Sequence, residues 1–259
     1  MEAVGGLRSW RNGLSRKRSR PCGWGAGEEF RGEAILAVTK ALLQSGVAYI
    51  GGYQGAPISH LLDVFADASE VLEELGVHFE SSASEASACA MLAASVNYPL
   101  RGAVAWKSVV GTNVASDALS SVASGGVTGG ALIILGEDYG EGSSIMQERT
   151  HAFAMKSQVW LLDRARTCPR SWRWWRRASN CRKPPTPGDA GAAHPRLPPH
   201  GRFTAKDNVR PAFTAREALE NPDARPEPHR PAARQLSARA GEGVAPLAGR
   251  RGLSSPATA

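Results

Sequence analysis

The chain has 259 residues, with 31 Lys and Arg against 24 Asp and Glu, which gives a formal net charge of +7. This length is enough for one or two domains. The four cysteines (Cys22, Cys89, Cys168 and Cys181) form no CxxC pair, so their spacing supports neither a disulfide framework nor a zinc or iron–sulfur site. The sequence has no run of about 18 apolar residues, so we expect no transmembrane helix.

Charge is distributed unevenly along the chain. The net charge is +5 over residues 1–27, −10 over residues 28–163 and +12 over residues 164–259, and 14 of the 17 prolines lie in the last segment. We therefore expect one acidic folded domain at 28–163. A basic, disordered or non-native segment at 1–27 precedes it, and a Pro/Arg-rich, mostly disordered segment at 164–259 follows it.

Within residues 28–163, helical and strand patterns alternate with short loops between them. This order predicts an α/β fold, a parallel sheet flanked by helices and joined by right-handed crossovers. The apolar spacing predicts strands at 47–50, 77–79, 100–106, 131–135 and 159–162, and helices at 28–45, 58–66, 69–75, 85–97, 114–124 and 145–157.

In an open parallel sheet, ligands bind beyond the carboxyl ends of the strands. The loops predicted there are rich in Gly, Ser, Asn and Asp, and one of them leads into Glu85 at the first turn of a helix. A carboxyl group held between a strand and a helix, beside an apolar interior, suits acid–base work. A second interpretation stays open, because Ser82 to Glu85 also fits the S-x-x-E capping box.

Other candidate residues have simpler interpretations. Lys107 ends a strand and is expected to be solvated, and Asn113 fits a helix cap. Asp138 fits an ordinary loop acid. Lys107-Ser108 lacks the preceding glycines of a P-loop, and no GxGxxG follows the first strand. Nucleic-acid binding is not favoured, because the basic segments and the tryptophans at 172–175 have no recognition fold beside them.

Four stretches carry a family resemblance. They are GGYQGAPISHLLDV (51–64), FESSASEASACAMLAAS (79–95), KSVVGTNVASDAL (107–119) and residues 130–163. In this order they resemble the pyrimidine-binding domain of thiamine-diphosphate-dependent 2-oxoacid:ferredoxin oxidoreductases, within that family the indolepyruvate type. The likeness ends at Asp163 and returns over 201–222.

The resemblance implies that Glu85 is the catalytic glutamate, which hydrogen-bonds N1′ of the aminopyrimidine of thiamine diphosphate. Relatives often carry a hydroxyl where this chain has Ala56, so a substrate contact at that turn is in doubt. The residues that match cofactor-proximal positions of the family are Gly55, Ala56, Pro57, Gly111, Asn113 and Asp138.

The resemblance also implies partners. A diphosphate-binding domain or subunit would carry magnesium, iron–sulfur clusters would pass electrons to ferredoxin, and a 2-oxoacid and coenzyme A would be the substrates, in the cytoplasm. The chain would then be a fragment or subunit that holds half a site, and we expect it to be inactive when isolated. One alternative is a non-catalytic ligand-binding or assembly module of the same fold, and a lesser one is a basic nucleic-acid-binding protein.

The flanking composition suggests a further hypothesis. Reading GC-rich coding DNA out of frame yields Arg, Pro and Ala in quantity. We therefore hypothesise that residues 1–27, 164–200 and 223–259 are at least partly frameshifted.

Overall fold

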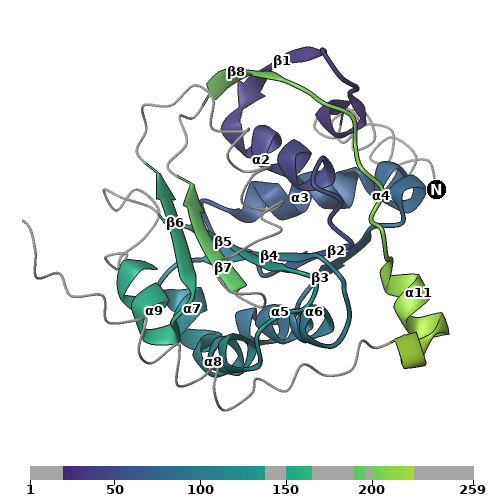
Figure 1. The fold of residues 1–259 in the computed structure, drawn as a ribbon. Coiled ribbons are helices and arrows are strands. Elements are labelled where there is room, and N and C mark those ends of the chain that lie inside the picture. The colour runs from purple at the N-terminus through teal and green to yellow at the C-terminus, as the bar shows by residue number, and fades with distance from the viewer. Residues whose placement is uncertain (1–19, 138–149, 165–189, 196–199, 225–259) are drawn as a thin grey trace, which may run out of the picture. The chain divides into compact units, whose positions relative to one another are not determined.

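The fold is taken from a computed structural model, which describes residues 20–137, 150–164, 190–195 and 200–224 (Figure 1). Its centre is a parallel sheet with the strand order β3-β2-β4-β5-β7-β6. These strands are β2 (Tyr49–Gly52), β3 (His78–Ser81), β4 (Gly102–Lys107), β5 (Ala131–Gly136), β6 (Trp160–Arg164) and β7 (Ala190–Pro195). The predicted class, a parallel sheet flanked by helices, is confirmed.

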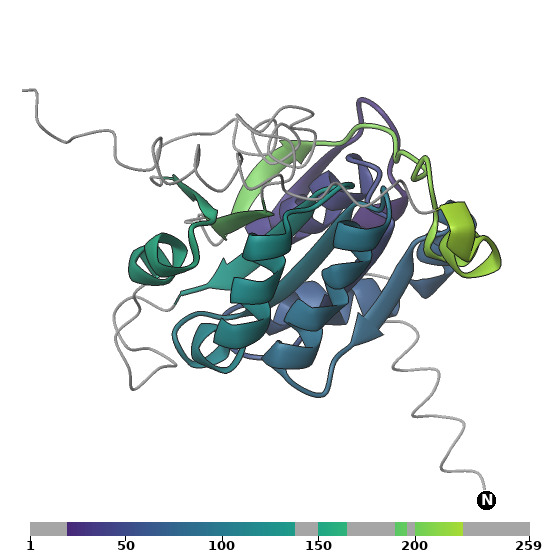
Figure 2. The same ribbon diagram turned by 60° about the horizontal axis from the view of Figure 1, so that its bottom comes forward.

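Helices cover both faces of the sheet (Figure 1). On one face lie α2 (Ala34–Leu43), α3 (Ser59–Asp67) and α4 (Ser69–Leu75). On the other face, brought forward in Figure 2, lie α5 (Glu85–Met91), α6 (Ala93–Asn97), α7 (Val110–Val114), α8 (Ser116–Gly125) and α9 (Thr150–Ser157). The short elements η1 (Arg20–Gly23), α11 (Ala215–Glu220) and η2 (Pro222–Ala224) complete the described helices.

Strand β4 shows why the sheet sits between two cores. Successive side chains of a strand point to opposite faces. Accordingly Ala103 and Ala105 belong to the core beneath α2 and α3, whereas Val104 and Trp106 belong to the core beneath α5 and α8. All six residues of β5 are buried, as a continuous apolar run predicts for a strand covered on both faces.

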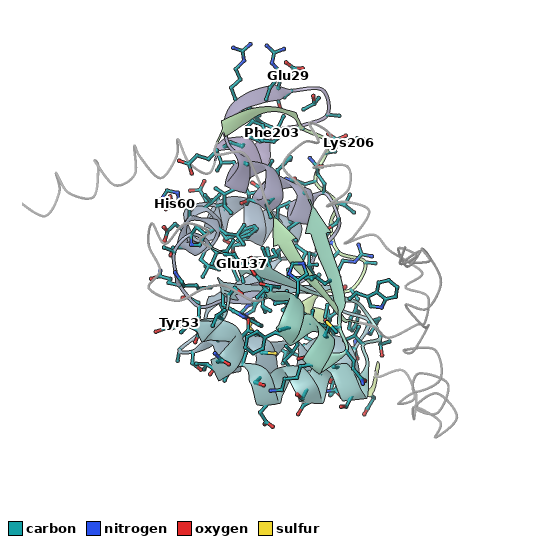
Figure 3. The ribbon with its side chains drawn as sticks, turned by 90° about the vertical axis from the view of Figure 1, so that its left-hand side faces the viewer. Glu29, Tyr53, His60, Glu137, Phe203 and Lys206 are labelled. Atoms are coloured by element: carbon teal, nitrogen blue, oxygen red, sulfur yellow. The ribbon has the colours of Figure 1, made fainter. Side chains whose placement is uncertain are left out.

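The predicted helix at 28–45 is wrong in its first part. Residues Glu29–Glu33 form strand β1, which pairs antiparallel with β8 (His200–Thr204), and helix α2 begins only at Ala34. Phe30 packs against Phe203 with ring centroids 5.1 Å apart. Figure 3 shows the pair of strands that carries Glu29 and Phe203. A partner strand far along the chain therefore overrides the local helical pattern.

Other predicted boundaries also shift. The predicted helix at 85–97 is two helices, α5 and α6, and residues 110–114, expected in a loop up to 113, form α7. Strand β3 is an edge strand with exposed His78 and Glu80, not a fully buried one. Gly51 and Gly52 belong to β2 and not to a loop. Of the predicted helix at 145–157, residues 145–149 lie outside the described part of the chain.

The segment after 163 contributes to the same fold. Strand β7 lies between β5 and β6, although the sequence around it shows no strand pattern. Residues 203–209, within the stretch that resembles the family again, pack on α2, where the Val209 N–H donates to the Leu43 carbonyl (3.0 Å). The limits of the flanking segments stay predictions, but these residues are part of the folded unit.

Lys40 holds three segments together. Its side chain is buried, with 2% of the residue exposed, and its Nζ donates to the carbonyls of Cys22 (3.2 Å) and Trp24 (2.5 Å) and to Oδ1 of Asn208 (2.5 Å). Burial lowers the pKa of Lys40, and the nearby Cys22, Asp207 and Glu28 oppose that shift. Residues 22–24, expected in the basic leading segment, are thus fixed to the core.

Candidate functional site

The loops at the carboxyl ends of the strands converge as the topology predicts. The loop after β2 leans over β4, because a Cβ added to Gly55 would lie 2.8 Å from Cβ of Lys107. The same loop reaches β5, since a Cβ on Gly136 would lie 3.2 Å from Cδ of Pro57. Both glycines are therefore needed for the close approach of backbone segments.

Glu85 is the first residue of α5, and it does not form the predicted capping box. The N-cap is Ser84, whose Oγ accepts from the Ser87 N–H (3.2 Å). The Ser82 N–H, which the box would assign to Glu85, instead donates to the Gly52 carbonyl (2.8 Å). The capping interpretation is wrong because the backbone at Ser82 still continues the pairing of β3 with β2.

The carboxyl group of Glu85 has an unusual environment for an acid. The residue is only 6% exposed. Among the residues that the structure describes, none makes a hydrogen bond or ion pair with this carboxyl group. No hydrogen bond or ion pair with a described residue therefore explains the position of this carboxyl group.

Gly111 packs directly on Glu85. A Cβ added to Gly111 would lie 2.9 Å from Cγ of Glu85, 3.1 Å from its Oε1 and 2.6 Å from Cδ1 of Trp106. Real Cβ atoms do not approach other atoms so closely, so only glycine fits without a shift of its neighbours. Two of the predicted site residues, Glu85 and Gly111, are thus brought together.

Trp106 and Thr112 are members of this cluster that the sequence analysis missed. Trp106 is fully buried and its Nε1–H donates to Oγ1 of Thr112 (3.1 Å), which is also buried. The only sequence signal is a tryptophan at the end of an apolar strand with a hydroxyl residue six positions later. That signal is weak because nothing in the local sequence shows that the loop between the two residues brings their side chains together.

The remaining predicted residues lie elsewhere at the same edge. Asn113 is exposed on α7, its N–H donates to the Val109 carbonyl (2.8 Å), and α8 has Ala115 as its N-cap, so the predicted cap role of Asn113 is wrong. Val109 has φ 49°, a conformation rare for a β-branched residue. Ala56 and Pro57 are exposed and joined by a cis peptide bond. Asp138 lies outside the described residues.

A second polar cluster fixes the start of α9. Oε1 of Glu137 accepts from the Thr150 N–H (2.9 Å), and the Thr150 hydroxyl lies 2.7 Å from the Ser108 hydroxyl. The Ser108 N–H donates to the Gly136 carbonyl (2.8 Å). A carboxylate at a helix N-terminus is favourable, so Glu137 has a structural role. Tyr53 and Glu137, labelled in Figure 3, follow the ends of β2 and β5.

The described residues include no group of three or more His, Cys, Asp or Glu side chains that could hold a metal ion. None of the helices within the described ranges is long and apolar enough to cross a bilayer.

These features define a class of fold, an open parallel α/β sheet with a buried acid where one of its edge loops enters a helix. The 2-oxoglutarate:ferredoxin oxidoreductase of Magnetococcus marinus shares the fold, with a TM-score of 0.51 and 12% identity over 72% of this chain and 34% of that one. No family model matches the chain.

The relatives in sequence are more specific. The chain is 32% identical over 137 residues to the indolepyruvate oxidoreductase subunit IorA of Thermococcus kodakarensis, and 32% identical over 127 residues to IorA of Methanothermobacter marburgensis. These matches cover 51% and 49% of this chain but only 21% and 20% of the relatives, so the chain spans about a fifth of their length. The predicted resemblance to an indolepyruvate oxidoreductase subunit is confirmed.

Proposed function

We propose that this chain carries the aminopyrimidine-activating half of a thiamine-diphosphate site in a 2-oxoacid:ferredoxin oxidoreductase of the indolepyruvate type. The observation that carries the proposal is Glu85, a residue only 6% exposed whose carboxyl group has no partner among the described residues and lies at the edge where parallel sheets bind ligands. The similarity to IorA over about half of the chain supports the same assignment.

The residues present fit one part of the cofactor. A buried acceptor at a helix start can take a hydrogen bond from the N1′–H of an aminopyrimidine, and Gly111 leaves no side chain in the way. When bound, thiamine diphosphate supplies the ylid that lets a 2-oxoacid lose carbon dioxide. Glu85 would hold the ring in orientation and keep the proton at that nitrogen.

The residues described offer no cluster for magnesium. We assign the diphosphate, the magnesium ion and the iron–sulfur clusters to a partner domain or subunit, because the chain spans only about a fifth of the length of IorA. Ferredoxin would be the electron acceptor and coenzyme A the acyl acceptor. The Magnetococcus enzyme was solved with 2-oxoglutarate, coenzyme A and succinyl-CoA bound, which supports a 2-oxoacid and coenzyme A as substrates of the assembled site. Gly55, Ala56, Pro57, Asn113 and Asp138 stay proposed neighbours of the cofactor.

Calorimetric titration with thiamine diphosphate and magnesium tests the cofactor assignment, on the full chain mixed with the remaining part of Thermococcus kodakarensis IorA, which would hold the diphosphate. Glu85→Gln should weaken binding about tenfold or more, because it removes a charge-assisted hydrogen bond. Glu80→Gln is the matched control, since Glu80 is an exposed acid on β3, and it should leave the affinity unchanged. Equal binding by Glu85→Gln would favour a non-catalytic ligand-binding module, and no binding by the mixture that contains the unmodified chain would overturn the proposal.

Complementation tests the oxidoreductase assignment. The chain alone should show no turnover. When it is mixed with the remaining part of Thermococcus kodakarensis IorA and its partner subunit, we expect indolepyruvate-dependent reduction of ferredoxin, which Glu85→Gln should abolish. Turnover by the isolated chain would contradict the half-site assignment.

A further inference from the structure

Glu85 has no polar partner among the described residues, so something else must set the direction of its carboxyl group. One contact that bears on this direction comes from the backbone of Gly111, which packs on Cγ and Oε1 of the glutamate. Gly111 lies in α7, a helix of five residues, and so short a helix does not hold its own position.

The side chain of Trp106, which precedes α7, both packs against this helix and hydrogen-bonds it. Trp106 is the largest fully buried side chain among the residues that the structure describes, and it lies in β4 with its Cδ1 against Gly111. Its indole N–H donates to Thr112, the residue after Gly111. The hydrogen bond closes the connection from β4 to α7 and holds Gly111 where the indole ring and Glu85 both pack against its Cα.

We propose that Trp106 and Thr112 are positioning residues that set the rotamer of Glu85 through Gly111. The inference rests on the proposed function, because it assigns this packing to the acid that would bind the aminopyrimidine. It adds that buried contacts of Trp106 and Thr112 orient the Glu85 carboxyl group. The hydrogen bond between Trp106 and Thr112 would then control cofactor affinity without touching the cofactor.

Nuclear magnetic resonance on the labelled full chain tests this packing without any cofactor. We expect a nuclear Overhauser effect between Hα of Gly111 and Hγ of Glu85, and one dominant Glu85 rotamer from scalar couplings. Thr112→Val keeps the side-chain shape but removes the acceptor, so it should weaken this effect about twofold or more and spread Glu85 over several rotamers. Thr112→Ser restores the hydroxyl and should restore both signals.

A control separates positioning from general loss of stability. Tyr49→Phe removes another buried hydrogen bond in the same core, the one between Tyr49 and Ser95 (2.6 Å), and should leave the Glu85 signals unchanged. If Thr112→Val does not fold, Trp106→Phe removes the same bond from the donor side. Unchanged Glu85 signals in a folded Thr112→Val or Trp106→Phe variant would overturn the inference.

Thiamine diphosphate affinity provides the functional readout, measured for each form of the chain in the mixture with the remaining part of IorA. Thr112→Val should bind the cofactor about tenfold more weakly than the unmodified chain, and Thr112→Ser should bind it within about twofold. If the resonance results are as expected but the unmodified chain binds no thiamine diphosphate, the positioning inference stands and the proposed function fails. If the unmodified chain binds it and Thr112→Val binds equally well, the inference fails alone.

Discussion

Lys40 and Asn208 are joined by a 2.5 Å hydrogen bond across 168 residues of sequence. The same Asn208 side chain donates through Nδ2 to the Cys22 carbonyl (2.8 Å), which also accepts from Lys40. Three segments that the charge distribution separates are therefore part of one folded unit. Asn208 lies in the stretch 201–222, where the family resemblance returns, and its hydrogen bonds attach that stretch to the core.

Lys40→Met should destabilise the protein by about 3 kcal/mol, because it leaves two backbone carbonyls and the Asn208 amide oxygen without this donor in a buried position. Urea denaturation measures the change. Lys156→Met is the control, since Lys156 bonds Ser116 at the exposed surface and should cost less than about 0.5 kcal/mol. A Lys40→Met variant as stable as the control would show that the buried amine does not hold the segments.

Phe203→Ala tests whether residues 200–204 belong to the native fold. Phe203 is 7% exposed and packs on Phe30, so we expect a loss of about 3 kcal/mol in the free energy of unfolding. Leu219→Ala on α11, where the leucine is 83% exposed, should change stability little. A negligible effect of Phe203→Ala would mean that β8 does not pair with β1 in solution.

Gly111→Ala should displace Glu85 or Trp106, because the new methyl group would lie within 3 Å of both side chains. We expect thiamine diphosphate binding to fall about tenfold or more and stability to fall by about 1–3 kcal/mol. Gly125→Ala is a matched control, since it also replaces a helical glycine but meets only Val96 at 3.4 Å. The control should keep the affinity, and Gly111→Ala binding with unchanged affinity would refute the close contact.

Glu85→Gln should leave stability unchanged or raise it by up to about 1 kcal/mol. The substitution replaces one polar group by another of the same size, and the carboxyl group that it removes makes no hydrogen bond or ion pair with a described residue. Thermal unfolding measures this, in parallel with the titration that should show lost cofactor binding. A marked loss of stability would instead reveal a structural role for the carboxylate.

Stability should decline at alkaline pH. Burial raises the pKa of the Cys22 and Cys89 thiols from 9.0 to about 12. The unfolded chain releases these protons near pH 9 while the folded chain keeps them, so stability is complete below 9 and is lost as the pH rises toward 12, by about 1.4 kcal/mol per pH unit for each thiol.

Lys40 acts in the opposite direction in this range, because its pKa is lowered by burial and its deprotonation favours the folded state. Because the decline comes from the two thiols and not from Lys40, a variant with both Cys22→Ala and Cys89→Ala should show no fall in the urea midpoint between pH 9 and 10. An unchanged decline in that variant would assign the effect to other groups.

The sequence alone determined the α/β class, the carboxyl-end loops on which the site is proposed, and the place of Glu85 at a helix start. Helix α4 has the predicted limits, and the buried run of β5 was predicted to within one residue. These features depend on local patterns, since the spacing of apolar residues records which side of a helix or strand is buried.

Only the tertiary structure decided that β1 is a strand, that β7 enters the sheet, and that Trp106, Gly111 and Glu85 form one packed cluster. Each of these depends on a partner distant in the sequence. A local pattern records burial but not the identity of the neighbour, and the hydrogen bonds and close contacts that fix these residues arise only when the strands are brought together.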